Sequence, residues 1–190
     1  MMKKTDSLPN LIGKHKNLSL GIITFENLQK QQIPWLKEKL QQAHIAEWMH
    51  GAGLQSCLDR IDGYHENSCE DQLWIASLSE KPFAYLISSR ADKQEKFWKD
   101  IQFGQGEART LDVFILDPEL LGQGLGTRMI RQFIQELPAV VTDILIDPEK
   151  TNTRAVRVYE KVGFRDCFEF IAPWHPVPHR QMHLKRPNPR

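Results

Sequence analysis

Several features that would assign a chain to a class of protein are scarce in these 190 residues. Only three cysteines are present, Cys57, Cys69 and Cys167, and no two of them form a CxxC pair. An odd number of separated cysteines argues against a disulfide framework and is typical of a reduced, cytoplasmic protein. No apolar run approaches the length of a membrane span. The basic residues at 3–4 are not followed by the apolar stretch of a secretion signal.

An excess of charge of either sign is also missing. The 25 Lys and Arg residues nearly balance the 24 Asp and Glu residues, so the net charge is +1. Such a balance provides no general attraction to nucleic acid or to a membrane surface. The length, with 41% hydrophobic residues, suits one globular domain. Residues 1–17 are polar, and we expect a flexible tail there, followed by a single domain over residues 18–190.

The spacing of apolar residues predicts helices and strands in a mixed order. The clearest helical patterns cover 123–137 and 151–162. Weaker ones cover 25–48, where Pro34 marks a second start and Gly51 and Gly53 follow the end, and 54–61. Strands are predicted at 18–23, 73–78, 83–89, 109–116, 140–147, 164–171 and 180–186. This order predicts a single α/β domain with a mixed sheet.

The stretch LLGQGLGTRMI at 121–131 is the most informative motif. Three glycines stand between a predicted strand and a predicted helix, where main-chain N–H groups and the helix dipole favour an anion. Thr127 and Arg128 could add a hydroxyl and a cation. The stretch does not fit the dinucleotide motif GxGxxG, since Thr127 replaces the third glycine, and it lacks the lysine of a Walker loop. A tight structural turn is the alternative.

The same stretch resembles the coenzyme A pyrophosphate loop of the GNAT acetyltransferases, Q/R-x-x-G-x-G/A, although Leu121 stands at the Gln or Arg position. A second segment, DPEKTNTRAVRVYEKVGF at 147–164, resembles the family pattern N-x-x-A-x-x-x-Y-x-K-x-G-F. Within the family, the bacterial aminoglycoside 6′-N-acetyltransferases are most similar, because they share LGxGLGT and a segment like WLKEKLQQAHIAEW at 35–48. The resemblance implies a mixed, mostly antiparallel central sheet flanked by helices.

The resemblance also implies acetyl-coenzyme A as cosubstrate, and no metal. The pyrophosphate would lie on the glycine loop. The pantetheine arm would pair with the strand before that loop and contact the helix at 151–162. The residues expected to bind it are Phe114, Leu116, Gly122, Gln123, Gly124, Leu125, Gly126, Thr127, Arg128, Asn152 and Ala155.

Two side chains are candidates for catalysis. The family pattern places Tyr159 near the sulfur, where a phenol with a pKa of about 10 can donate to a leaving thiolate. An ordinary buried tyrosine on the apolar helix face is the alternative. Asp112 interrupts the apolar strand at 109–116, and a carboxylate there needs a reason. It could accept a proton from an ammonium group, anchor a cationic substrate, or pair with Arg109.

Acidic residues gather between positions 43 and 73, where Arg60 is the only lysine or arginine; they are Glu47, Asp59, Asp62, Glu66, Glu70 and Asp71. A cleft of one charge sign concentrates ligands of the other sign. Glu47, Trp48, Asp112 and Asp147 are therefore expected to bind a cationic amine. A solvated acidic surface and a tryptophan of the core are the alternatives. His175, His179 and His183 are four apart, but Pro173, Pro176 and Pro178 exclude the helix that would make them metal ligands.

The expected function is acetyl transfer to the 6′-amino group of an aminoglycoside by a monomer or a homodimer. One alternative keeps the donor and changes the acceptor to a siderophore hydroxylamine, a polyamine or a protein amine. Another is a non-catalytic module that binds coenzyme A. The C-terminal segment APWHPVPH at 172–179 has no counterpart in the resemblance.

Overall fold

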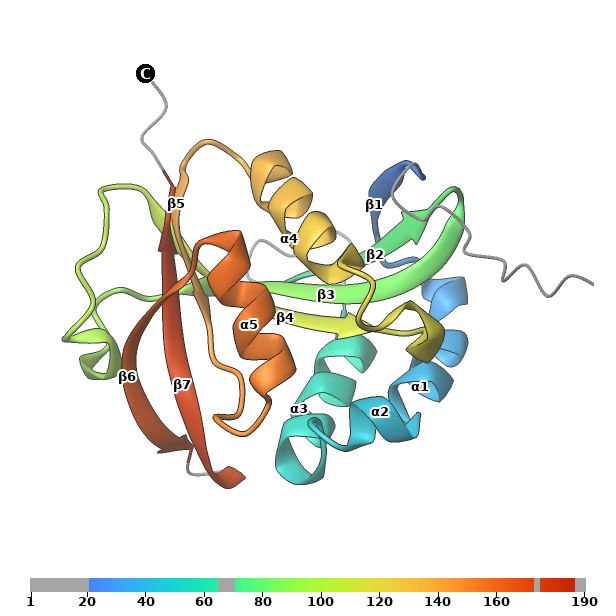
Figure 1. The fold of residues 1–190 in the computed structure, drawn as a ribbon, viewed down its shortest axis with the longest axis horizontal. Helices are drawn as coiled ribbons and strands as arrows, with labels where there is room; N and C mark the ends of the chain where they lie inside the picture. Colours follow the sequence, from blue (N-terminus) through green and yellow to red (C-terminus); the bar gives the residue numbers. More distant parts are fainter. Residues whose placement is uncertain (1–20, 65–70, 173–174, 187–190) are drawn as a thin grey trace, which may run out of the picture.

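The computed structural model of the protein describes residues 21–64, 71–172 and 175–186. Its centre is a seven-stranded sheet in the order β1-β2-β3-β4-β5-β7-β6 (Figure 1). The strands are β1 (Ile23–Asn27), β2 (Asp71–Leu78), β3 (Lys81–Ala91), β4 (Glu107–Ile115), β5 (Val141–Ile146), β6 (Arg165–Ala172) and β7 (His175–Lys185). All neighbouring strands are antiparallel except β4 and β5. This confirms the mixed, mostly antiparallel sheet that the resemblance implied.

The parallel pair β4–β5 opens along its length. The two strands pair from Glu107↔Val141 to Thr110↔Leu145, while β4 continues to Ile115. Beyond Thr110 the described pairing with β5 has ended, although β4 remains paired with β3 up to Ile115. The main chain in the C-terminal half of β4 therefore faces an opening in the sheet.

The helices are α1 (Ile33–Leu40), α2 (Ala43–Ala46), α3 (Gly51–Asp62), α4 (Leu125–Glu136) and α5 (Thr153–Val162), with short 3-10 segments η2 (Lys30–Gln32), η3 (Lys96–Trp98) and η4 (Pro118–Leu120). Helices α4 and α5 confirm the two patterns that the sequence showed most clearly. The first buries an apolar stripe that includes Met129 and Phe133, and the second starts after the cap Asn152. None of the described helices is long and apolar enough to cross a bilayer.

Two hydrophobic cores lie on opposite faces of the sheet, because successive side chains of a strand point to opposite sides. Helices α4 and α5 pack on the face that carries Ala84 and Leu86 of β3. Helices α1, α2 and α3 pack on the other face, where Tyr85 and Ile87 of the same strand lie. Figure 1 shows these helices as two separate groups.

The boundaries predicted for residues 18–61 were partly wrong. Residues 18–20 lie outside the described part of the chain, and Phe25 belongs to β1 rather than to a helix. The ring of Phe25 packs on Phe133 of α4 at a centroid distance of 5.2 Å, and β1 pairs with β2. These contacts with distant segments override the local helical pattern. Gly51 and Gly53 begin α3 instead of following the end of a helix.

The proline-rich segment joins the last strand. The predicted pair of C-terminal strands is confirmed, but β7 starts at His175 and includes Pro176 and Pro178. Proline has no N–H to donate, yet its carbonyl still accepts, and the N–H of Lys150 donates to the Pro178 carbonyl at 2.8 Å. The segment is not helical, as its prolines predicted.

Candidate active site

A large pocket lies at the opening between β4 and β5. Its volume is about 1340 Å³, and both groups of helices contribute to its lining. One side is formed by the segment from α2 to α3, with Trp48 and Met49, and another by the glycine loop and α5. A third wall comes from the loop between β3 and β4, through Phe97 and Trp98. Two ligands can therefore approach the opening from opposite faces of the sheet.

The glycine loop has the backbone that its sequence indicated. Gly122 and Gly124 have φ angles of +74° and +77°, which L-residues with a side chain rarely adopt. Among the described residues nothing lies within 4 Å of a Cβ built on either glycine. Gly124 caps the N-terminus of α4, so the first main-chain N–H groups of a twelve-residue helix face this open space. The loop can hold an anion.

Only some of the side chains predicted to bind the donor from this loop face the pocket. Thr127 lines the pocket, whereas Leu125 is buried in the core and lies outside the pocket lining. Gln123 donates to the carbonyl of Glu119. Arg128 was expected to face the anion, but it donates to the carbonyl of Gly21. It lines a smaller pocket along α4 that shares Gly124 and Thr127 with the main one, and it is not part of the main lining.

Positive charge reaches the main pocket from a different helix. Arg154 and Arg157 of α5 line it, together with Gly126 and Ala155. Neither arginine was predicted from the sequence, although both lie within the segment 147–164 that resembles the family pattern. Their position one turn apart at the start of α5 is the signal that could have identified them.

The main chain of β4 presents different residues to the opening than expected. The N–H of Leu116 donates to the Phe83 carbonyl of β3 at 2.7 Å. In an antiparallel pair the main-chain groups of alternate residues point to the same side, so those of Phe114 also face β3. The groups of Val113 and Ile115 then face the opening. Consistently, Nε2 of His44 lies 2.8 Å from the Ile115 carbonyl oxygen, on the side away from β3. This corrects the expectation for the main chain of Phe114 and Leu116. Phe114 still lines the pocket, whereas Leu116 does not.

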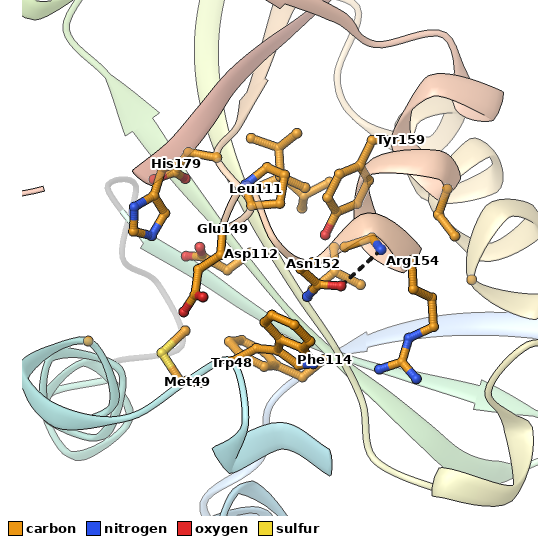
Figure 2. Close-up of a pocket in the computed structure, with 18 of the residues that line it drawn as sticks. Trp48, Met49, Leu111, Asp112, Phe114, Glu149, Asn152, Arg154, Tyr159 and His179 are labelled. Atoms are coloured by element: carbon orange, nitrogen blue, oxygen red, sulfur yellow. Dashed lines mark hydrogen bonds between the residues drawn. The ribbon is translucent and has the colours of Figure 1, made fainter. Parts of the chain in front are cut away.

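Helix α5 brings two of the predicted residues to the pocket. Oδ1 of Asn152 accepts a hydrogen bond from the Ala155 N–H at 3.1 Å, which caps the helix and leaves Nδ2 toward the pocket (Figure 2). The Tyr159 ring is 8% exposed and packs edge-on against Phe164, with its hydroxyl directed at the pocket. Burial raises the pKa of Tyr159, and the charges of Asp112 and Asp147 raise it further. The phenol is therefore protonated at neutral pH.

Asp112 lies on β4 within the pocket, and its partner is Arg60 of α3. Nη1 of Arg60 is 3.5 Å from Oδ2 of Asp112, and its Nε is 3.9 Å from Oδ2 of Asp71. The predicted alternative of a pair with Arg109 was wrong, because residues 109 and 112 point to opposite faces of the strand. Burial raises the pKa of Asp112, and the Arg60 charge opposes that rise.

Two further carboxylates follow the end of β5. Asp147 and Glu149 both line the pocket, and Glu149 Oε1 lies 4.0 Å from Nε2 of His50. Burial raises the pKa of Asp147 to about 7, with the Asp112 charge adding to the rise. Glu149 was missed in the sequence. Glu149 lies two residues after Asp147 in an extended segment, so both side chains point to the same side of the chain. This spacing could have identified Glu149 from the sequence.

The acidic stretch at 43–73 does not form the pocket. Glu47 is exposed and outside the pocket lining, which corrects its expected role, whereas Trp48 lines the pocket as predicted. Asp59 accepts from Gln55, and Asp62 pairs with Lys37 on the surface. Residues 66 and 70 lie outside the described residues. These acids are mostly a solvated surface.

We expect Asp147→Asn to change how stability depends on pH. An unfolded aspartate has a pKa of about 4, and folding raises the pKa of Asp147 to about 7. The native state therefore binds the extra proton between these values, and the free energy of unfolding falls as the pH rises through them. Asparagine removes this dependence. The difference between variant and wild type should thus grow in favour of the variant by about 2–3 kcal/mol from pH 5 to pH 8.

Urea unfolding at the two pH values measures this difference. Asp100→Asn, at an exposed position in a loop, is the control and should show no such trend. A pH-independent difference for Asp147→Asn would contradict the raised pKa.

In the described parts of the chain, no group of three or more His, Cys, Asp or Glu residues is placed to hold a metal ion.

Comparisons with known proteins agree with this geometry. Residues 29–171 match the family model described as an acetyltransferase (GNAT) domain. The chain is 30% identical over 148 residues to an aminoglycoside N(6′)-acetyltransferase type 1 from Klebsiella pneumoniae, covering 75% of this chain and 73% of that protein. It is similar to the crystal structure of an aminoglycoside N(6′)-acetyltransferase from Legionella pneumophila, with a TM-score of 0.75 and 39% identity, over 86% of this chain and 91% of that one. A structure of an aminoglycoside acetyltransferase with coenzyme A and kanamycin gives a TM-score of 0.71 at 28% identity, over 87% and 95% of the two chains.

Proposed function

Since this chain belongs to the GNAT acetyltransferase family, and is thus an acyltransferase that uses acetyl-coenzyme A, we propose that its acceptor is the 6′-amino group of an aminoglycoside. The observation that carries the proposal is the set of three carboxylates, Asp112, Asp147 and Glu149, gathered at the opening opposite the glycine loop. Carboxylates in a partly closed pocket attract a polycationic amine. The names of the relatives support the same acceptor class.

The donor fits the side of the opening formed by the glycine loop and α5. The open space beside Gly122 and Gly124 would let a pyrophosphate approach the main-chain N–H groups. Arg154 and Arg157 would supply the positive charge. The pantetheine arm would pair with the main chain of β4 at residues 113 and 115, as an added strand.

Nδ2 of Asn152 would donate to the same arm from the opposite side, because Oδ1 is already engaged as the helix cap. The thioester would then lie beneath the Tyr159 hydroxyl, between α5 and β4. Ala155, which is small and half-buried, leaves room for the arm along the start of α5.

The acceptor would occupy the other side of the opening. Its ammonium groups would lie against Asp112, Asp147 and Glu149, and Trp48 would offer a ring face to a sugar. Burial raises the pKa of Asp112, and Arg60, held between Asp71 and Asp112, opposes that rise and so supports the ionised carboxylate. An ionised carboxylate is the form that both anchors a cation and accepts a proton.

The proposed reaction moves two protons. Asp112 accepts one from the ammonium group, directly or through a water molecule, and the neutral nitrogen attacks the thioester carbonyl carbon. A C–N bond forms and the C–S bond breaks, with its electron pair leaving on sulfur. Tyr159 donates its proton to that sulfur, and the second proton lost by the nitrogen restores the phenol. The products are the amide and free coenzyme A.

An acceptor panel tests the proposal. We expect purified protein with acetyl-coenzyme A to release free thiol with 6′-amino aminoglycosides. With the matched 6′-hydroxyl compounds kcat/KM should be at least about 100-fold lower, since the nucleophile is missing. Linear polyamines and hydroxylamines complete the panel. Turnover of those compounds alone, or none with any aminoglycoside, would overturn the choice of acceptor while leaving the donor assignment intact.

A further inference from the structure

The loop between β3 and β4, residues 92–106, forms one wall of the pocket with the residues at its tip. Its tip carries Glu95, Phe97 and Trp98 to the pocket lining. In Figure 1 this loop is the yellow-green segment beside β6. The Phe97 ring packs edge-on against Phe168 and Phe170 of β6 at centroid distances of 5.4 and 4.9 Å. Phe97 nevertheless stays 41% exposed, so packing alone anchors the tip only in part.

The two ends of the loop are joined by one lysine. Nζ of Lys93, at the start of the loop, donates to the carbonyl of Gly104 at 2.8 Å and to the carbonyl of Gly106. It also lies 5.2 Å from the centroid of the Phe103 ring. A positive charge with several donors can hold two carbonyls at once. Lys93 therefore holds the two ends of the loop together and closes residues 94–103 between them.

This closed loop is fastened to β5 by a buried carboxylate. Asp143 is fully buried and accepts hydrogen bonds from the Gly104 N–H at 2.9 and 3.1 Å, and from Thr142 Oγ1 at 2.7 Å. Its other bonds come from His183 Nε2 of β7 at 2.8 Å and from Lys93 at 3.4 Å. We call Lys93, Gly104, Gly106, Asp143 and His183 the loop neck.

The neck leaves little room for another arrangement. A Cβ on Gly106 would lie 2.1 Å from the Val140 carbonyl oxygen, and one on Gly104 would lie 3.0 Å from Thr142 Oγ1. Both glycines thus allow the main chain of the loop to sit directly on the start of β5. A buried charged group with this many partners is costly to disturb, because any lost partner leaves charge unpaired.

We propose that the loop neck positions the pocket wall formed by Glu95, Phe97 and Trp98, and that it thereby sets the affinity for the acceptor amine. The second half of this statement rests on the proposed function, since the wall adjoins the acceptor side of the pocket. The neck residues do not line the pocket and act through the loop. They are positioning residues.

Lys93→Met tests the proposal, because it keeps the apolar stem and removes the ammonium that joins the two ends. We expect hydrogen exchange at residues 94–103 to become at least about tenfold faster. The KM for the acceptor should rise about tenfold, while the KM for acetyl-coenzyme A and kcat stay within about threefold. A general loss of folding would move all these values together.

Two matched variants complete the experiment. Lys99→Met removes an exposed lysine of the same loop and should change nothing, and Lys93→Arg keeps a cation with several donors and should restore the acceptor KM. Unchanged exchange in Lys93→Met would overturn the proposal, and so would faster exchange with an unaltered acceptor KM. Should wild type acetylate no amine in the panel, the proposed function fails, and the exchange measurement alone then decides whether the neck holds the wall.

Discussion

Asp112→Asn is expected to lower kcat/KM for the acceptor amine by about 100-fold or more and to leave the KM for acetyl-coenzyme A within about twofold. Asparagine has nearly the same shape but neither accepts the proton of an ammonium group nor carries its counter-charge. The proposed donor side consists of the glycine loop and α5, so the KM for acetyl-coenzyme A should not respond. Steady-state kinetics with each substrate varied in turn gives both numbers.

The same measurement separates the two roles left open for Asp112. If the carboxylate is the base, kcat falls; if it is only an anchor, the acceptor KM rises and kcat is kept. The control is Asp59→Asn, which removes an acid from α3 that bonds Gln55 on the surface. Activity of Asp112→Asn equal to that of the control would show that Asp112 is structural.

Gly124→Val should raise the KM for acetyl-coenzyme A by about 10- to 100-fold. The new side chain would project into the open space beside the loop, where the pyrophosphate is proposed to meet the main chain. It would also strain the backbone, because φ is +77° at this position. The acceptor KM should change little, since the acceptor is proposed to lie across the opening.

Gly51→Val is the matched control for backbone strain. Gly51 also has a positive φ, +55°, with open space at its Cβ, but it starts α3 outside the pocket lining. Both variants should lose similar stability, measured as Tm, while only Gly124→Val loses affinity for the donor. Equal KM values for acetyl-coenzyme A in the two variants would contradict the proposal that the glycine loop binds the donor.

Local sequence was enough to predict the parts of the site that depend on neighbouring residues. The apolar repeats of α4 and α5, and the glycine-rich turn in front of α4, follow from short-range physics. These elements also carry the family resemblance. The proposed donor side could therefore be anticipated only in part. Arg128 turns to the Gly21 carbonyl, and Arg154 and Arg157 were not predicted. On β4, the main chain of residues 113 and 115 faces the opening in place of that of residues 114 and 116.

The acceptor side depends on contacts that no local pattern encodes. Arg60 and Asp112, which form an ion pair, are 52 residues apart in the sequence. Asp62 of the acidic stretch instead forms an ion pair with Lys37 on the surface of the protein. The ends of the strands decide which acidic side chains line the pocket. Asp147 and Glu149 follow the end of β5 and line it, whereas Glu47 does not. The loop neck is a further case, since Lys93, Asp143 and His183 come from three distant segments.

The opening between β4 and β5 separates two kinds of recognition. On one side the proposed donor contacts combine main-chain groups of β4 and of the glycine loop with side chains of α5. On the other side the proposed acceptor contacts are side chains on β4, after the end of β5, between α2 and α3 and on the loop between β3 and β4, where single changes alter charge and shape. The range of amines accepted can therefore drift through surface mutation while use of the same acyl donor persists, so the architecture allows a new resistance or metabolic role without rebuilding the enzyme.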